Sequence, residues 1–450
     1  MTNFIKINLL LALSGQAVCA QTSQSISLAQ AQQQAIEQNR RLKIARYKVD
    51  ESGYKITEAR SRLYPLIVAN GMYAYNGVTR DLTLPRGSIG VLPGTTPIPL
   101  PQQDLTLFKA KHNLFLGNVL AYQPISQLGK IKDGVKVAEA DVELARTQVS
   151  EAELAIRQGV EKLYYGLLIA QKQQQQTQTT IDLTQAKLYD VESALLAGKT
   201  DPVNKVGLQA DLANQQQQLL QLSNQIEDYT ADLNELLGQS SGTPLMINPV
   251  SDSLPTLNPL TTYLEGAKTG NLELRQADQT SQKATLGVQA ARKDYIPTVG
   301  ALGGYLFQNV ISDLPQSNYF LGLQMSYNIV DFGRRRSTLN QRLSQQKQAD
   351  ENRQYTSEHV RADVEKAYRK ARQAQSLLPI AGQAAQYRRD ELKIKNDRLV
   401  AGLVLKRDVL ETQATLTKAE VDLYAAQMAY RLALTELEQK SGISHLSAQH

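Results

Sequence analysis

The sequence predicts a mainly α-helical protein with a small β part, in which two structural repeats each contain a long antiparallel coiled-coil hairpin. Three observations predict this fold class: an internal duplication, apolar residues that recur every seven positions, and short segments in which apolar and polar residues alternate. The composition agrees, because the 450 residues include no Trp and only 6 Phe. Such a chain suits long helices with hydrated faces better than one thick core.

The duplication divides the chain into two repeats. Matched residues recur at one constant spacing early in each half and at a second constant spacing later: Asn39 with Asn271, Pro65 with Pro297, Gly71 with Gly303, then Gly129 with Gly333, Val160–Tyr164 with Val364–Tyr368, and Gly198 with Gly402. We therefore expect a first repeat at residues 21–237 and a second at 260–440. A linker rich in Gly, Ser and Pro at 238–259 joins them, and 441–450 forms a C-terminal tail.

Each repeat has the pattern of a helix, two strands, a very long helix, a tight turn and a returning helix. In the first repeat the long helix is expected at 130–197, which at about 1.5 Å per residue would be roughly 100 Å long. Gly198 is a natural helix C-cap, and Asp201-Pro202 are a natural N-cap and first helical residue, so the chain reverses there. The second repeat is expected to form a helix at 334–400, to reverse at Ala401-Gly402 and to return to about residue 439.

The returning helices carry a seven-residue apolar repeat. The seam positions are Leu212, Leu219, Ile226 and Leu233 in the first repeat, and Leu416, Leu423, Tyr430 and Leu437 in the second. A strict seven-residue period makes helices supercoil left-handedly around their neighbours. An amphipathic helix in an ordinary bundle shares part of this pattern, but its agreement between the two halves favours a sustained coiled coil.

Residues 1–20 are typical of a secretory signal peptide, with an apolar run followed by small residues at Val18-Cys19-Ala20. A lipoprotein signal that acylates Cys19 is the alternative. Cys19 is the one cysteine of the sequence, so cleavage after Ala20 would leave no disulfide, thiolate or Cys–metal chemistry. The mature chain then opens with a helix expected at 27–62.

Two strands are expected in each repeat. The clearest strand alternates an apolar row with a mostly polar one, and the apolar row is Tyr319, Leu321, Leu323, Met325 and Tyr327. Weaker candidates lie at 299–307, 66–76 and 114–122, and a Gly- and Pro-rich segment at 77–103 is typical of a long exposed loop. Membrane barrel strands have this alternation, and a small soluble hairpin at the end of a helical protein is the competing interpretation.

The strands, taken with the absence of an apolar helix, predict an oligomer. No segment of the mature chain has eighteen consecutive apolar residues, so the sequence offers no transmembrane helix candidate. A membrane span would then be a closed barrel, because lipid provides no partners for backbone groups. Four β-strands per chain cannot close a barrel, so we expect three chains to share a 12-stranded transmembrane barrel in a trimer.

The order of elements, the duplication and the turn residues resemble the TolC family of outer membrane efflux proteins over nearly all of the mature chain. The most specific segment is Ala401-Gly-Leu-Val-Leu-Lys-Arg-Asp-Val-Leu-Glu411, which is similar to the family's second hairpin tip, G-x-x-x-x-x-D-V-L-[DE]-A. The resemblance implies a homotrimer in outer membrane lipid whose helical tunnel reaches into the periplasm. It also implies tripartite efflux or type I secretion, in which an inner membrane transporter and a periplasmic adaptor hand over substrates for passive export.

The resemblance also implies a periplasmic gate. The family's acidic constriction corresponds to Asp408 and Glu411, which share one helix face and, repeated by symmetry, would favour cations and bind multivalent ions as blockers. Both are also ordinary first-turn acids favoured by the helix dipole, and that interpretation stays open. Asn204 is the first-repeat equivalent of Asp408 and joins the expected gate. Leu399 and Val404 stand where some members place a Tyr and an Arg for clasping hydrogen bonds, so this chain departs from that clasp.

The two helix tips are the expected contacts of the adaptor: Gly198, Lys199, Thr200, Gly402, Leu403, Val404 and Lys406. The glycines serve the chain reversal itself. Apolar side chains at Leu403 and Val404 are harder to explain without a partner.

Two other classes of protein share some of these sequence features. A soluble periplasmic coiled-coil adaptor or tether would share the signal peptide and the hairpins, but it would not need the alternating strand at 319–329. An enzyme is disfavoured because the 4 His are not spaced as ligands and no catalytic motif occurs, so no catalytic residue, metal site or cofactor is expected. The net charge of +6 is interspersed along the helices, which argues against a nucleic-acid partner.

Overall fold

The computed structural model describes residues 25–249, 254–311 and 314–443, so the expected signal peptide at 1–20 lies outside the described residues. The chain forms two compact units. One contains Met1–Leu42, Glu153–Leu260 and Glu365–Gln439, and the other contains Lys43–Ala152, Thr261–Val364 and Lys440–His450. The units cut across the two sequence repeats, because each repeat contributes to both.

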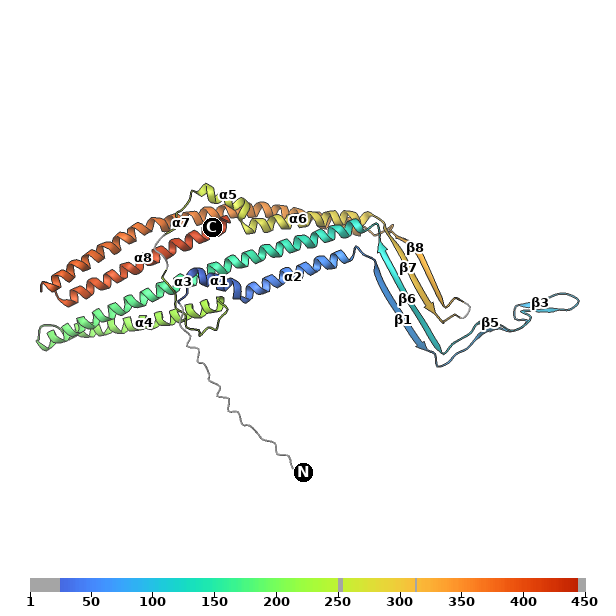
Figure 1. Ribbon diagram of the computed structural model, residues 1–450, viewed down its shortest axis with the longest axis horizontal. Helices are drawn as coiled ribbons and strands as arrows, with labels where there is room; N and C mark the ends of the chain where they lie inside the picture. Colours follow the sequence, from blue (N-terminus) through green and yellow to red (C-terminus); the bar gives the residue numbers. More distant parts are fainter. Residues whose placement is uncertain (1–24, 250–253, 312–313, 444–450) are drawn as a thin grey trace, which may run out of the picture. The chain divides into compact units, whose positions relative to one another are not determined.

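The two halves of the chain contain the same series of elements (Figure 1). The first half has α1 (Leu28–Gln38), α2 (Arg40–Ser61), β1 (Leu66–Tyr75), β6 (Asn113–Pro124), α3 (Leu128–Leu196) and α4 (Pro202–Leu236). The second half has α5 (Leu260–Gly270), α6 (Leu272–Arg292), a short 3-10 helix η1 (Lys293–Tyr295), β7 (Thr298–Gln308), β8 (Ser317–Ser326), α7 (Arg334–Val400) and α8 (Lys406–Ser441). The predicted duplication and the predicted long helices are therefore confirmed. No helix within the described ranges combines the length and the apolar character needed to cross a membrane.

The single helix expected at 27–62 is wrong, because Asn39 separates α1 from α2. Its side-chain oxygen accepts hydrogen bonds from the backbone N–H groups of Arg41 (2.9 Å) and Leu42 (3.3 Å), as an N-cap residue does. Its side-chain amide donates to the carbonyl of Leu236 at 3.2 Å, near the end of α4. A buried asparagine that caps a new helix therefore takes precedence over continuous helical propensity.

Asn271 does the same in the second repeat, between α5 and α6. Its side-chain oxygen accepts from the N–H of Leu274 at 2.8 Å, and its amide donates to the carbonyl of Lys440 at 2.9 Å. Asn39 and Asn271 were matched in the sequence, and Leu236 and Lys440 are matched by the spacing of the later segments. The duplication thus extends to individual hydrogen bonds.

The seven-residue seams are the less exposed positions of both returning helices. On α4, Leu233 is fully buried, while Leu212, Leu219 and Ile226 are half-buried between exposed neighbours. On α8 the buried stripe is wider and includes Leu416, Val421, Met428, Tyr430, Leu434 and Leu437. The wider stripe agrees with α8 making side-chain contacts to α3 as well as to α7.

The four longer strands form one antiparallel sheet in the order β1-β6-β7-β8. The central pair joins the two repeats, since β6 pairs with β7 from Leu116 opposite Gln308 to Pro124 opposite Gly300. β1 and β8 are the two edges. Pairing in β8 ends at Ser326, so Tyr327, which was expected on the strand, lies just beyond it.

The segment expected as an irregular loop at 77–103 contains ordered β-structure instead. β2 (Leu82–Leu84) pairs with β5 (Leu105–Phe108), and β3 (Gly90–Leu92) pairs with β4 (Ile98–Leu100), each pair antiparallel. Strands of three or four residues are too short to show a period-two pattern, which is why the sequence did not reveal them. The predicted exposure of this segment holds for most of its residues.

Candidate functional site

The two helix tips reverse the chain by the same hydrogen-bond pattern. In the first tip, Gly198 has φ of 65° and its N–H donates to the carbonyl of Leu195, while the N–H of the next residue donates to that of Ala194. In the second tip, Gly402 has φ of 72°, and the N–H groups of Gly402 and Leu403 bond to the carbonyls of Leu399 and Arg398. This is the Schellman arrangement, which favours glycine at the left-handed position. The glycine C-caps predicted from the sequence are therefore confirmed.

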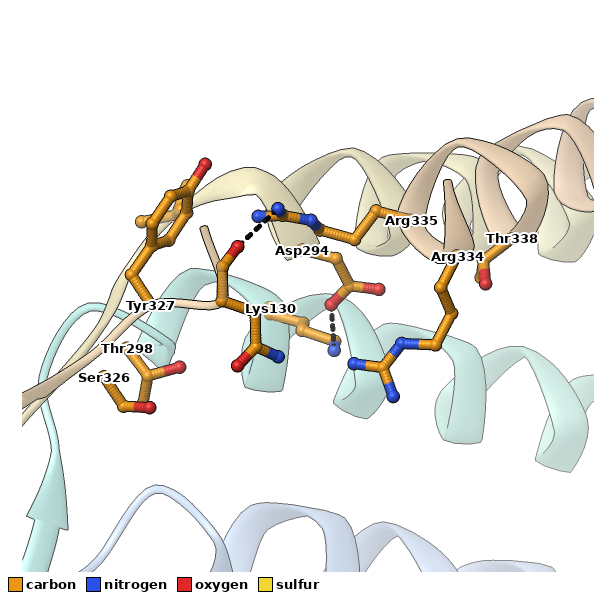
Figure 2. Close-up of a pocket in the computed structure, with 10 residues that line it drawn as sticks. Lys130, Asp294, Thr298, Ser326, Tyr327, Arg334, Arg335 and Thr338 are labelled. Atoms are coloured by element: carbon orange, nitrogen blue, oxygen red, sulfur yellow. Dashed lines mark hydrogen bonds and ion pairs between the residues drawn. The ribbon is translucent and has the colours of Figure 1, made fainter. Parts of the chain in front are cut away.

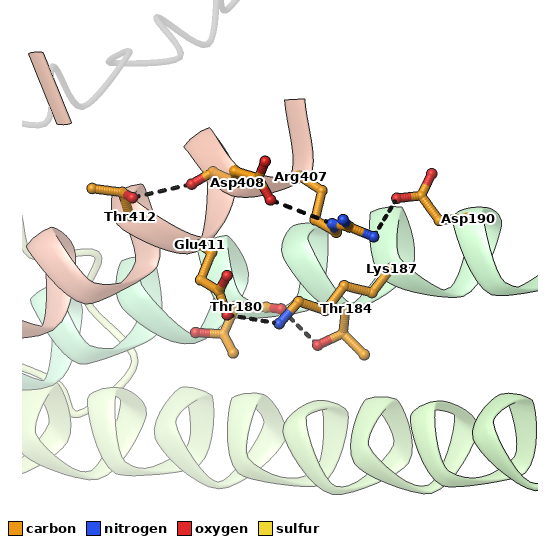
Figure 3. A network of polar contacts seen from close by, with 8 residues as sticks. All are labelled: Thr180, Thr184, Lys187, Asp190, Arg407, Asp408, Glu411 and Thr412. Atoms are coloured by element: carbon orange, nitrogen blue, oxygen red, sulfur yellow. Dashed lines mark hydrogen bonds and ion pairs between the residues drawn. The ribbon is translucent and has the colours of Figure 1, made fainter. Parts of the chain in front are cut away.

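A network of charged side chains joins the start of α8 to α3 near these tips (Figure 3). Lys187 Nζ on α3 lies 3.1 Å from Glu411 Oε1 on α8. Arg407 reaches Asp190 on α3 at 3.6 Å and its neighbour Asp408 at 3.4 Å. Two basic side chains, Lys187 and Arg407, therefore pair with three acidic ones across the two helices.

Asp408 also closes the first turn of α8. Its Oδ2 accepts a hydrogen bond from the backbone N–H of Leu405 at 3.1 Å, which occupies one of the free donors at a helix N-terminus. That hydrogen bond, together with Arg407, holds the pKa of the Asp408 carboxyl below its usual range. Asp408 is thus a helix-capping acid in addition to being a candidate gate residue.

The predicted gate residues divide into two groups. Asp408 and Glu411 belong to the network with α3. Asn204 does not join it, because its amide donates to Thr200 Oγ1 at 2.9 Å within its own turn. Lys406 is exposed at the start of α8.

Sequence reasoning missed Lys187, Asp190 and Arg407 as partners of the acids. Along the sequence, Lys187 and Glu411 are similarly far from the glycines of their respective tips. Aligning the two hairpins tip to tip and matching opposite charges could therefore have predicted this ion pair. The missing information was which face of α3 meets α8, which the shared heptad pattern does not specify.

The tips expose more apolar surface than the sequence suggested. Leu403 is 73% exposed, as expected, whereas Val404 is only partly exposed. Other exposed apolar side chains gather at the same two turns: Leu196, Val203, Val206, Val400 and Leu405. An apolar group of this size at the ends of polar helices is unusual for a surface without a partner.

In the other unit, the register of the sheet collects apolar side chains on one face. Tyr305 lies opposite Tyr319, Gly303 opposite Leu321, and Ala301 opposite Leu323. Directly opposed residues point to the same side of a sheet, so the predicted apolar row of β8 continues across β7, β6 and β1. The large exposed members of this face are Ile67, Tyr73, Tyr75, Phe115, Val119, Tyr305, Phe307, Tyr319, Leu321, Leu323 and Met325.

The four strands contain no charged residue, and aromatic residues gather at both of their ends. The ends away from the helices carry Tyr73, Tyr75, Phe115, Tyr305, Phe307 and Tyr319, and the ends toward the helices carry or adjoin Tyr64, Tyr122, Tyr295 and Tyr327. The opposite face holds polar groups such as Asn70 and Asn118, whose side chains hydrogen-bond at 3.0 Å, together with the apolar side chains of Leu66, Val68, Met72 and Phe320. An apolar band between two aromatic belts is the pattern of a strand surface that faces lipid.

Comparisons with known proteins agree with this geometry. The family model of outer membrane efflux proteins matches residues 31–239 and 264–442. Among curated protein sequences, none matches the chain significantly.

Solved structures of outer membrane channels share the fold. The CmeC outer membrane channel of Campylobacter jejuni superposes with a TM-score of 0.73 at 15% identity, covering 98% of this chain and 94% of that one. The outer membrane protein VceC of Vibrio cholerae gives 0.69 at 15% identity, covering 93% and 96%. The open state of the Neisseria gonorrhoeae MtrE channel gives 0.68 at 15% identity, covering 92% and 89%.

The family match sets aside both the soluble tether and the enzyme, because it extends over both repeats and includes the strands. The chain belongs to the outer membrane efflux protein family, and it is a TolC-like, non-enzymatic efflux channel of the outer membrane with a helical part in the periplasm.

Proposed function

We propose that three copies of this chain assemble into one conduit, with their sheets forming a shared 12-stranded barrel and their helices enclosing a periplasmic tunnel. The observation that carries the proposal is the sheet itself. It has an uncharged apolar face but ends in two edge strands, β1 and β8. Unpaired strand edges are not tolerated in lipid, so β1 of one chain pairs with β8 of the next.

In this assembly the conduit serves a tripartite efflux or type I secretion system. An inner membrane transporter and a periplasmic adaptor deliver the substrate, which then leaves passively. The exposed apolar groups of the two tips support an adaptor contact, because they lie where the helices reverse and Leu403 is largely exposed.

Asp408 and Glu411 form the periplasmic gate of this conduit. Three copies would place six carboxylates near one axis, and the cost of gathering them is reduced because Lys187 and Arg407 lie beside them. The same ion pairs hold α8 against α3 and so oppose opening. This takes the place of the Arg and Tyr clasp that the chain lacks at Val404 and Leu399.

Cysteine cross-linking between neighbouring chains tests the assembly. In a Cys19→Ser background, one cysteine in β1 (Ala69→Cys) would be combined with one in β8 (Gly322→Cys, Leu323→Cys or Gln324→Cys) in separate variants. At least one register is expected to give a covalent trimer in detergent-extracted membranes and pores in planar bilayers. A monomeric particle without conductance would overturn the proposal.

A further inference from the structure

A cationic pocket lies where the strands meet the helices in the second unit (Figure 2). It has a volume of about 400 Å³ and is lined by Lys130, Asp294, Ile296, Thr298, Ser326, Tyr327, Asn328, Arg334, Arg335 and Thr338. Three of these side chains are cationic and one is a carboxylate, so the lining has a net charge of +2. Apart from Tyr327, none of these residues was a predicted site residue, because they come from separate elements: α3, η1, β7, β8, α7 and the segments beside them.

Arg335 is fixed in the wall of the pocket. Its Nε lies 2.6 Å from Asp331 Oδ2 and its terminal nitrogen donates to the carbonyl of Asn328 at 2.7 Å. The guanidinium also lies over the rings of Tyr327 and Tyr295, at 4.8 Å and 5.5 Å from their centroids. The hydrogen bond from Arg335 holds the pKa of Asp331 below its usual range, so this pair stays ionised and the wall is preorganised.

The remaining charges leave one cation uncommitted. Lys130 pairs with Asp294, whereas the Arg334 side chain makes no ion pair or hydrogen bond with any residue that the structure describes. Figure 2 shows the guanidinium of Arg334 directed toward Lys130. The backbone N–H groups at the N-terminus of α7 do not provide the anion site, because Asp331 already accepts hydrogen bonds from the N–H groups of Gly333 and Arg335.

The surroundings of the pocket match an amphiphile with an anionic head. The exposed apolar residues beside it are Ile296, Tyr327, Ile329, Val330 and Phe332, the last of which is 99% exposed. Thr298 is the first residue of β7 and Ser326 the last of β8, and they pair with each other on the face opposite the apolar row. The pocket is therefore at the helix-side end of the sheet, beside Tyr327. In a membrane, aromatic and cationic side chains at this level lie among lipid headgroups.

We propose that this pocket binds the phosphate of an anionic phospholipid headgroup in the leaflet that faces the helices. Arg334 and Lys130 contact the phosphate oxygens, and the amide group of Asn328 contacts the rest of the headgroup. The acyl chains lie along the apolar face next to Tyr327. The proposal rests on the membrane placement given under the proposed function, and it adds a lipid-binding site to it.

Arg334→Ala tests the site, and Arg336→Ala is its matched control, because Arg336 is exposed on the same turn but does not line the pocket. The full chain would be delipidated in detergent and titrated with phosphatidylglycerol, and bound lipid counted by native mass spectrometry. Wild type and Arg336→Ala are expected to bind lipid equally. Arg334→Ala is expected to bind about tenfold more weakly, the loss typical of one charge-assisted contact, and Arg334→Lys is expected to recover part of it.

Competing ligands distinguish the sources of phosphate. Phosphatidylcholine is expected to bind more weakly than phosphatidylglycerol. Inorganic phosphate is expected to displace phosphatidylglycerol only in large excess. Displacement by equimolar inorganic phosphate would make this a free-phosphate site and overturn the lipid assignment, as would equal binding by Arg334→Ala and Arg336→Ala. If the lipid-binding test fails while the protein still forms trimers that conduct, only the lipid site is rejected and the proposed channel function is retained. If the wild type forms neither trimers nor conducting pores, the proposed function itself is rejected.

Discussion

Lys187 and Glu411 form an ion pair, 3.1 Å between Nζ and Oε1, that joins α3 of the first repeat to α8 of the second. The pair is within one chain, so each protomer can hold its own second hairpin against its first. Arg407 adds a second link to α3 through Asp190. If the conduit opens by moving the second hairpin, these pairs must break.

Removing the basic partners is therefore expected to favour the open channel. Exposed ion pairs contribute at most about 1 kcal/mol each, which corresponds to roughly a twofold to fivefold change per pair. Lys187→Ala combined with Arg407→Ala should raise resting conductance in planar bilayers by several fold. Lys205→Ala is the control, because Lys205 pairs with Glu192 inside the first hairpin and should leave conductance unchanged. Equal conductance in both variants would contradict the idea that the ion pairs of Lys187 and Arg407 hold the channel closed.

The carboxylates are expected to determine block by multivalent cations. Asp408→Asn with Glu411→Gln removes their charge while keeping similar shape, so it should abolish block by trivalent cations added from the periplasmic side. Asp201→Asn is the comparison, because Asp201 caps α4 at the other tip. Block that persists in the Asp408 and Glu411 variant would leave both residues as helix-capping and first-turn acids only.

The sequence was most informative where structure is periodic or local. The seams of α4 and α8, the glycine turns and the bounds of α7 follow from repeat spacing and capping chemistry, which act within a few residues. Asn39 was already visible as a matched residue, but its helix-breaking role depends on the carbonyl of Leu236, which only the fold brings near. The candidate gate acids, Asp408 and Glu411, were predicted from the family resemblance, whereas Lys187 was not, because its ion pair with Glu411 depends on the pairing of helices far apart in the sequence.

Tyr164 is expected to stabilise the helical unit through its hydroxyl group. The hydroxyl oxygen lies 2.6 Å from the carbonyl oxygen of Asn248 and 3.0 Å from that of Ile26. These contacts connect the linker and the start of the described chain to α3. Burial raises the pKa of Tyr164 to about 12, so the donor stays protonated. Tyr164→Phe removes this donor from the carbonyl of Asn248, whereas the carbonyl of Ile26 still accepts from the N–H of Asn248 at 3.0 Å. The loss should lower the free energy of unfolding by about 1–2 kcal/mol.

Urea unfolding followed by circular dichroism would measure this loss. Tyr189→Phe is the control, because Tyr189 lies on the same helix but is exposed. The control should unfold like the wild type. A Tyr164→Phe protein as stable as Tyr189→Phe would mean that water replaces the hydroxyl without cost.

Glu161 is expected to make stability depend on pH. It is buried between α3 and α8, where Thr435 donates a hydrogen bond to it at 3.1 Å. Burial raises the pKa of Glu161 from 4.5 to about 6, against the hydrogen bonds from Thr435 and Tyr165. Since the folded chain holds this proton more tightly than the unfolded chain, the stabilisation is fully present below pH 4.5 and is lost as the pH rises through 6.

Glu161→Gln should remove this dependence, because the amide keeps the shape of the protonated acid at every pH. Between pH 4.5 and 7 the wild type should lose about 2 kcal/mol that the variant does not lose. Unfolding in urea at several pH values would compare wild type, Glu161→Gln and Glu227→Gln, the last being an exposed acid on α4. If Glu161→Gln and Glu227→Gln follow the same pH profile, the carboxylate of Glu161 is already stabilised by its neighbours, and its burial carries no penalty in the folded chain.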